Sequence, residues 1–321
     1  MDGDIVELMF LKPIPRQAIW GKNKIGKYFG YKDFPENTGQ CWCASCHNEA
    51  SNIILNGPYA SYTLRELWDE HPEIFGNNSG IFPWIVGLVG PSDDLSIQVH
   101  PDDTYAERMN LTDSGKNEGW YFIDAMEDSS IVFGHKALSM DEFKHKMELD
   151  KWDELLLHKS VKKGDFVYIP SRTIHALCKN TIVYEIQQNS NLTYRLYDYK
   201  RKDSSGNERK LHIQEALENI NIPFCYQKTE TVTLLEEKNK IQRIISNDSF
   251  ELTLFKIIYE EEFAFTKCFA ILSVLDGRGT INGQEVHQGD HLLVPYTTES
   301  LVFSGELLVM MCSQKEEKEK I

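Results

Sequence analysis

The stretch Gly164–Ala176 reads GDFVYIPSRTIHA, and a related stretch, GDHLLVPYTTESL, occupies residues 289–301. Each begins with Gly-Asp and reaches a proline after an apolar run of strand-forming residues. Glycine and proline turn a chain between strands, so the repeat predicts that one β unit occurs twice in the chain. The fifth position after the proline is His175 in the first copy and Ser300 in the second. Only the first copy therefore keeps a metal-type ligand at this position.

Short apolar segments fill much of the remaining chain, among them SIVFG, IVYEIQQ, FAILSVL and LLVMMC. They are bounded by Gly, Asp, Asn or Pro, which predicts a mainly β protein of the sandwich or barrel type. Helical patterns near residues 63–75, 139–156 and 211–220 are expected to cover a sheet with their apolar sides. Thr63 and Glu66 have the spacing of a capping box, so a helix is expected to begin there.

The composition limits the classes of partner. The chain has 321 residues, enough for one large or two ordinary domains, and a formal net charge of −15. Nucleic acids and anionic membranes need clustered basic residues, so neither is an expected partner. No apolar run approaches the roughly 20 residues of a membrane-spanning helix, and the first residues, MDGDIVELMF, are acidic where a signal peptide is basic. We expect a cytoplasmic protein.

Seven cysteines, an odd number in a chain of this length, do not suggest a disulfide framework. The cluster CWCASCH contains Cys41, Cys43, Cys46 and His47, and it formally matches a haem-attachment pattern as well as a zinc ligand set. Haem attachment would need an export signal, and the C-x-C spacing is uncommon in zinc sites. Buried thiols in a strand are the favoured interpretation.

The sequence LSIQVHPDD places Gln98 and His100 on one face of an otherwise apolar strand. In GKNEGWYFID, Lys116 and Glu118 likewise share a face. If these strands and the turn before His175 border one barrel, then Gln98, His100, Glu118 and His175 converge on a cation, which would remain a Lewis acid. The alternative is that the histidines are hydrogen-bonded core residues and that Glu118 lies at a solvated strand end. Nitrogen and oxygen ligands suit zinc, but also manganese, iron or cobalt.

Two of these motifs resemble those of the cupins. GDFVYIPSRTIHA resembles the second cupin motif, and Gln98-x-His100 followed by Glu118 resembles a variant of the first. The resemblance implies a mainly β fold of two cupin (jelly-roll barrel) units with helical insertions. We expect a catalytic, metal-binding domain over residues 1–228 and a cupin-like domain without metal ligands over residues 229–321. The segment around 226–242 is polar and charged, so it is expected to join the two units.

More specifically, SIQVHPDD, GKNEGWYFI, IPSRTIHAL and EIQQNSNLTYRLYDYKR together resemble the class I mannose-6-phosphate isomerases, in their short Gram-positive form. This resemblance implies one Zn²⁺ per chain, other divalent metals being alternatives. The metal ligands that it implies are Gln98, His100, Glu118 and His175. The implied catalytic residue is Arg195, and the residues implied to line the substrate pocket are Ser96, Lys116 and Glu185.

The chain departs from the family pattern at Arg172, where glycine is usual, and at Gly87, where lysine is common. A plain interpretation of Arg172 is a surface turn residue. Both departures concern the shape of the pocket or the contacts of a phosphate group. The candidate phosphate donors are Lys116, Lys200, Arg201, Arg172 and, as a neutral donor, Ser96.

The reaction implied by the resemblance is the interconversion of mannose 6-phosphate and fructose 6-phosphate through an enediolate. The metal and the guanidinium of Arg195 would stabilise the negative charge that develops on oxygen. Glu185, His100 and a water on the metal remain candidates for the base. A metal-dependent cupin oxygenase and a non-catalytic cupin that binds sugar phosphates are the alternative functions. The sequence does not indicate the oligomeric state.

Overall fold

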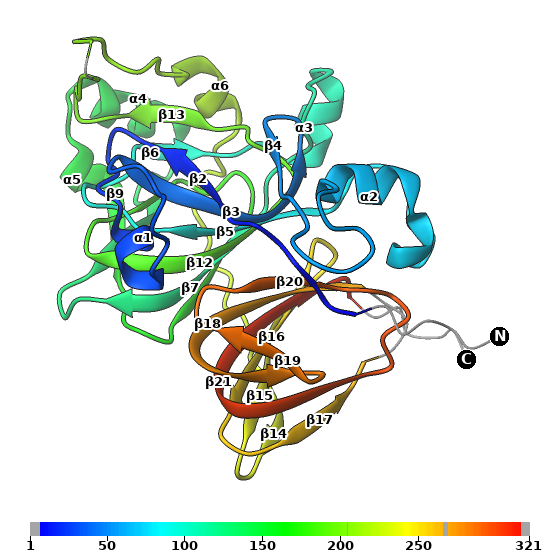
Figure 1. Ribbon diagram of the computed structural model, residues 1–321. Coiled ribbons are helices and arrows are strands. Elements are labelled where there is room, and N and C mark those ends of the chain that lie inside the picture. Colours follow the sequence, from blue (N-terminus) through cyan, green and yellow to red (C-terminus); the bar gives the residue numbers. More distant parts are fainter. Residues whose placement is uncertain (1–6, 204, 266–268, 316–321) are drawn as a thin grey trace, which may run out of the picture. The chain divides into compact units, whose positions relative to one another are not determined.

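The computed structural model describes residues 7–203, 205–265 and 269–315, and its chain is drawn in Figure 1. These residues divide into two compact units. The site unit contains residues 15–41 and 88–228, and the terminal unit contains the described residues within 1–14, 42–87 and 229–321. The last segment of the terminal unit begins at Thr229. Residues 7–14 and 42–87, which we expected in the first domain, group with this segment instead.

Two sheets supply the strands of the site unit, and the second of them also includes residues 14, 42–47, 50–51 and 84–87, which group with the terminal unit. One orders its strands β13-β6-β11-β8-β9, and the other orders them β10-β7-β12-β5-β3-β2, with β4 beside β3. The chain passes between the two units within β3 and β5. The strands of the first sheet are β6 (Ile97–Val99), β8 (Ser130–His135), β9 (Leu156–Ser160), β11 (His175–Leu177) and β13 (Tyr194–Tyr197). Those of the second are β2 (Ile14–Gln17), β3 (Thr38–His47), β4 (Ala50–Ser51), β5 (Trp84–Val89), β7 (Glu118–Ala125), β10 (Phe166–Ile169) and β12 (Thr181–Gln188).

Helices cover the outer face of the sheet that contains β6 and β13 (Figure 1). They are α4 (Met140–Glu148), α5 (Trp152–Leu155) and α6 (Ile213–Glu218); the unit also contains α1 (Lys24–Phe29) and α3 (Asp103–Arg108). Phe143, Leu155 and Ala216 from these helices pack in one core with Val99 and Leu196 from the sheet. The expected helices thus form, and their apolar sides face a sheet as predicted.

Side chains alternate along each strand, so every second residue faces the interior of this barrel. These interior residues are apolar toward one end and polar at the other. Trp120 of β7, Leu177 of β11 and Val183 of β12 belong to one interior core. Each of these strands also carries a polar residue two positions away, which faces the same interior. These residues are Glu118 on β7, His175 on β11 and Glu185 on β12. The polar side chains therefore gather at one end of a barrel whose other end is sealed by aromatic and aliphatic groups.

The terminal unit contains a larger sheet. Its order is β1-β20-β18-β21-β16-β15-β14, with β17 beside β21 and β19 beside β18. The strands are β1 (Met9–Phe10), β14 (Val232–Glu236), β15 (Lys240–Ser246), β16 (Glu251–Ile257), β17 (Glu261–Ala264), β18 (Ala270–Ile281), β19 (Gln284–His287), β20 (His291–Val294) and β21 (Ser300–Ser313). Phe255, Leu272, Phe303 and Val309 are part of an apolar core inside this unit. Apolar side chains therefore fill the interior of this unit.

A helix, α2 (Leu64–Glu70), and a 3₁₀ turn, η1 (Pro72–Phe75), precede β5 in the terminal unit. The expected capping box is present, since the Thr63 hydroxyl accepts from the Glu66 main-chain N–H and the Glu66 carboxylate accepts from that of Thr63. No helix of the described residues is long and apolar enough to cross a membrane.

The polar segment 226–242 differs from the expected linker. Its second half forms strand β14 and the start of β15, which pair in antiparallel fashion. These strands could not be predicted from the sequence, because β14 lies at the edge of the sheet and Val232 and Leu234 are exposed. An edge strand in contact with solvent needs no alternation of apolar residues, and charged residues there discourage pairing with other chains.

Candidate metal centre

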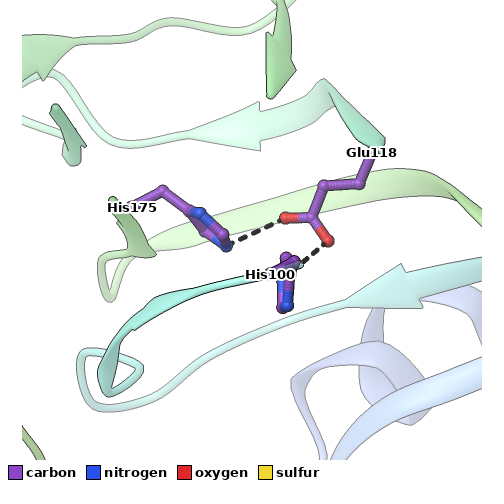
Figure 2. Close-up of side chains that lie close together, drawn as sticks. All are labelled: His100, Glu118 and His175. Carbon is purple, nitrogen blue, oxygen red and sulfur yellow. Dashed lines mark ion pairs between the residues drawn. The ribbon is translucent and has the colours of Figure 1, made fainter. Parts of the chain in front are cut away.

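His100, Glu118 and His175 point toward one another in the interior of the site unit (Figure 2). His100 follows the end of β6, Glu118 begins β7 and His175 begins β11, so the two sheets of the barrel both contribute. One ligand atom from each residue lies within 4.8 Å of the others, and all three residues are buried. Among the described residues this is the only such group of three or more His, Cys, Asp or Glu side chains. The convergence predicted from sequence is therefore present for these three.

Both imidazoles are held by main-chain carbonyls on the far side of the ring. Nδ1 of His100 lies 2.7 Å from the Leu192 carbonyl oxygen, and Nδ1 of His175 lies 2.9 Å from that of Thr173. A carbonyl oxygen only accepts, so each neutral ring carries its proton on Nδ1. The lone pair on each Nε2 is then directed toward Glu118. Metal-binding histidines are commonly oriented in this way by a carbonyl on the second nitrogen.

The carboxylate of Glu118 lies between the two rings. Its Oε2 is 3.3 Å from Nε2 of His100, and its Oε1 is 3.1 Å from Nε2 of His175 (Figure 2). Burial raises the pKa of Glu118, but the positive charge of Lys116, together with the interactions of the two neighbouring histidine rings, outweighs this and holds the pKa well below its ordinary value. Burial lowers the pKa of His100 to about 3. Glu118 is therefore ionised and His100 is neutral at neutral pH.

Gln98 completes the group on the side of β6. Its side-chain amide lies 3.3 Å from Nε2 of His175, and its other amide atom accepts from the Ser96 hydroxyl at 3.4 Å. The register of β11 with β6 pairs His175 with Gln98 directly. A half-turn of this amide would turn its oxygen toward Nε2 of His175. Gln98 thus lies beside His175, and Ser96 contacts Gln98.

Lys116 and Glu185 add charge beside this group. The Lys116 ammonium lies 3.1 Å from Oε2 of Glu118, and both side chains are buried. Glu185 accepts hydrogen bonds from Gln40 at 2.8 Å and from the indole N–H of Trp120 at 2.9 Å. Burial and the negative charge of Glu118 raise the pKa of Glu185. The site therefore contains a carboxylate that ionises readily and one whose ionisation is opposed.

Arg195 lies on β13, opposite Gln98 of β6 in the register. Its neighbours Tyr194 and Leu196 pack into the outer core under the helices, so alternation directs the Arg195 side chain to the interior face. Its Nε is buried and has no hydrogen-bond partner among the described residues. Burial and the positive charge of Arg209 lower its pKa. The register of the strands brings Arg195 beside the candidate ligands, although the two segments are distant in sequence.

Other candidate residues lie outside this cluster. Arg172 binds Asp102 and Asn221, and Arg201 binds the carboxylate of Asp198. Lys200 is exposed and pairs with Asp150. Each of these cations already has an acidic or amide partner. None of them is held against the histidines and Glu118 by a contact like that of Lys116.

The cysteine cluster lies on β3. Alternation along the strand directs Cys41 and Cys43 to one face and Cys46 to the other, so the three thiols do not converge. Burial raises the pKa of the Cys46 thiol well above its ordinary value, which disfavours the thiolate that binds metals. The geometry favours buried core thiols.

The two side chains that hold Glu185 were not predicted from the sequence; they are Gln40 and Trp120. Trp120 stands in GKNEGWYFID, two positions after Glu118 and therefore on the same face, which was a usable signal. Gln40 offered none, because its approach to Glu185 joins residues that are 145 positions apart.

Comparison with known proteins identifies the family of the chain. Residues 8–120 match the family model described as phosphomannose isomerase type I, catalytic domain. The chain is 42% identical to the probable mannose-6-phosphate isomerase GmuF of Bacillus subtilis (strain 168) over 89% of this chain and 93% of that protein. The chain belongs to the type I phosphomannose isomerase family.

Further type I phosphomannose isomerases resemble the chain along its length. Mannose-6-phosphate isomerase ManA of B. subtilis (strain 168) is 37% identical over 90% of this chain and 93% of its own. A crystal structure of the mannose 6-phosphate isomerase from B. subtilis superposes with a TM-score of 0.92 at 36% identity, covering 95% of this chain and 99% of the other. These findings confirm the predicted family, the predicted mainly β cupin fold and the prediction that the protein is an isomerase.

Proposed function

We propose that the protein interconverts mannose 6-phosphate and fructose 6-phosphate, using a divalent metal held by Gln98, His100, Glu118 and His175. The observation that carries the proposal is the set of buried acceptors in the site. Nε2 of His100 and both carboxylate oxygens of Glu118 are buried and make no hydrogen bond of acceptable geometry among the described residues, although Oε2 of Glu118 forms an ion pair with Lys116. Family membership supports the reaction, and the relatives named above carry that activity in their names.

The donor set fits a metal ion. Acceptor atoms that face one another at 3.1 and 3.3 Å repel unless a cation or a proton lies between them. The carbonyls at Nδ1 already take the ring protons, and the lowered pKa values of Glu118 and His100 oppose further protonation. Two imidazoles and a carboxylate, with the amide oxygen of Gln98 as the fourth donor, suit zinc best. When bound, the metal would supply Lewis acidity at the substrate oxygens.

Arg195 is proposed as the catalytic residue that stabilises charge. Removing the proton next to the substrate carbonyl gives an enediolate, whose negative charge develops on oxygen during the reaction. A guanidinium stays protonated and offers several donors, so it stabilises this charge more than the neutral ground state. The buried Nε of Arg195, without a partner among the described residues, supports this role.

We further propose that Lys116, Glu185 and Ser96 line the substrate pocket. Lys116 carries positive charge at the edge of the site and is a donor for substrate oxygens. Glu185 is a suitable proton carrier because burial and the charge of Glu118 raise its pKa, which favours the protonated form. Glu185 and His100 both stay candidates for the base. Zinc as the native metal, one ion per chain, and a cytoplasmic location stay predictions.

A coupled assay tests the function. The purified protein is incubated with mannose 6-phosphate, and fructose 6-phosphate is measured as it forms. We expect turnover that is abolished by removing divalent metal and restored by adding zinc, and no comparable turnover of glucose 6-phosphate. Oxygen consumption in the iron-loaded protein would instead indicate an oxygenase. Binding of mannose 6-phosphate without product formation would indicate a non-catalytic cupin.

A further inference from the structure

His212 binds the main chain of Arg195 through two hydrogen bonds. The main-chain N–H of Arg195 donates to Nδ1 of the His212 ring at 3.3 Å, and the main-chain N–H of His212 donates to the Arg195 carbonyl at 2.8 Å. One residue thus satisfies both polar main-chain groups of Arg195. The two residues are 17 positions apart, so the contact closes a loop rather than a local turn.

These bonds lie on the open side of a strand. In the described residues β13 ends its sheet, with β6 as its neighbour on the other side. An edge strand leaves main-chain donors and acceptors without a partner strand. The His212 side chain replaces that missing strand at Arg195. The position of the Arg195 backbone is therefore fixed from both sides.

The same two bonds define how Arg195 faces β6. In an antiparallel pair, alternate residues point their main-chain groups away from the partner strand. Such residues form the non-hydrogen-bonded pairs, in which the side chains lie closer together. Arg195 directs its N–H and C=O to His212, and its register partner on β6 is Gln98. This arrangement brings the guanidinium-bearing side chain close to the candidate ligand Gln98.

The His212 ring binds strand β13 and makes no capping bond to its own helix. His212 is the N-cap residue of α6, a position that favours Ser, Thr, Asp or Asn because their side chains bind the first helical N–H groups. The His212 side chain makes no such bond. Its ring lies 6.1 Å from that of Tyr194, and burial lowers its pKa, which keeps Nδ1 available as an acceptor. The helix start is left without its usual cap.

We propose that His212 is a positioning residue for the isomerase reaction, and that its Nδ1 acceptor and main-chain N–H hold Arg195 in register with Gln98. The proposal rests on the function proposed above, in which Arg195 stabilises the developing negative charge. Loss of the ring acceptor should let the edge strand shift. A displacement on the order of 1 Å at a catalytic group reduces turnover by up to about a hundredfold.

The test uses two substitutions at His212. His212→Phe keeps a ring beside Tyr194 but removes the acceptor, and His212→Ala removes both. We expect kcat and kcat/KM to fall together by roughly tenfold to a hundredfold in each, with metal content and melting temperature near those of the wild type. Gln214→Ala is the matched control, because Gln214 is exposed on the same helix and binds Glu218, and it should retain wild-type kcat.

A double substitution tests whether His212 acts through Arg195. We expect His212→Phe to lower kcat in the wild type but to have little further effect in Arg195→Ala, since the group being positioned is gone. Wild-type kcat in His212→Phe would overturn the proposal, as would an equal loss in both backgrounds. If the wild type shows no isomerase activity, the proposed function fails instead. If Arg195→Ala retains normal kcat, the role of Arg195 fails.

Discussion

Oε1 of Glu118 lies 3.1 Å from Nε2 of His175, and Nδ1 on the far side of that ring lies 2.9 Å from the Thr173 carbonyl oxygen. Glu118 is also the only anionic member of the proposed ligand set. We expect Glu118→Gln to lower metal affinity strongly, because the neutral amide no longer offsets the charge of a buried cation. Elemental analysis of the purified variant after dialysis measures this effect.

Glu185→Gln is the matched control for that measurement. It removes the charge of a second buried carboxylate in the same barrel, but Glu185 binds Gln40 and Trp120 rather than the histidines. We expect its metal content to equal that of the wild type. Full metal retention in Glu118→Gln would show that the carboxylate is not a ligand.

Arg195→Ala should separate catalysis from metal binding. Removing one preorganised donor from a site of developing negative charge commonly lowers kcat by about 10² to 10³. The metal content should be unchanged because Arg195 contributes no ligand atom. Arg195→Lys keeps the charge but loses the planar fork, so we expect an intermediate kcat. A near-normal kcat in Arg195→Ala would contradict the assigned role.

The number of metal ions tests the difference between the two units. The terminal unit has Ser300 where the site unit has His175, and its interior is filled by apolar residues. We expect one tightly bound metal per chain, lost in His100→Ala and His175→Ala and retained in Cys43→Ser. Two tightly held ions in the wild type would contradict this expectation. Loss of one of them in Cys43→Ser would then locate the second at the cysteines.

The candidate site was predictable because short-range patterns encode it. Gln98 and His100 lie on one face of their strand, and Glu118 and Trp120 lie on one face of theirs. Strand alternation therefore predicts that each pair points the same way. The repeated Gly-Asp and proline positions marked the second β unit. The capping box at Thr63 followed from spacing in the same way. Each of these signals lies within a few residues of chain.

The remaining features depend on pairing between distant segments. Contact of His212 with Arg195, or of Gln40 with Glu185, follows from sheet order and register, which a single sequence does not determine. The grouping of residues 42–87 with the C-terminal part is of the same kind, because it reflects which strands meet rather than where composition changes. Strand β14 was missed since its exposed edge imposes no hydrophobic pattern.

The buried histidine of the terminal unit should make stability depend on pH. His291 shares a 2.8 Å hydrogen bond with Ser273, and burial lowers its pKa to about 3. The unfolded chain, with an ordinary histidine pKa of about 6.5, therefore binds more protons between these values, and stability falls as pH decreases below 6.5. Between pH 7 and pH 5 this group alone should lower the free energy of unfolding by about 2 kcal/mol.

Urea unfolding of the wild type and His291→Asn at both pH values measures that contribution. Other titrating groups are shared and cancel in the difference, so the wild type should lose about 2 kcal/mol more than the variant on acidification. His287→Asn, at an exposed position, should behave like the wild type. Equal losses in the wild type and His291→Asn would show that the buried ring does not control the acid response.

Arg172 has a backbone conformation that favours glycine, with φ of 68°, and glycine is the residue that the family pattern would place there. A side chain in this region costs about 1 kcal/mol or more, whereas glycine adopts it freely. The strain is offset by contacts, since Arg172 binds Asp102 at 3.4 Å and Asn221 at 3.0 Å, and its main-chain N–H donates to the His100 carbonyl.

Arg172→Ala keeps the strain and loses the side-chain contacts, but Arg172→Gly loses both. We therefore expect the free energy of unfolding of Arg172→Gly to exceed that of Arg172→Ala by about 1 kcal/mol. Urea unfolding of the two variants measures this difference. Equal stability of the two variants would show that the backbone at this turn is not strained.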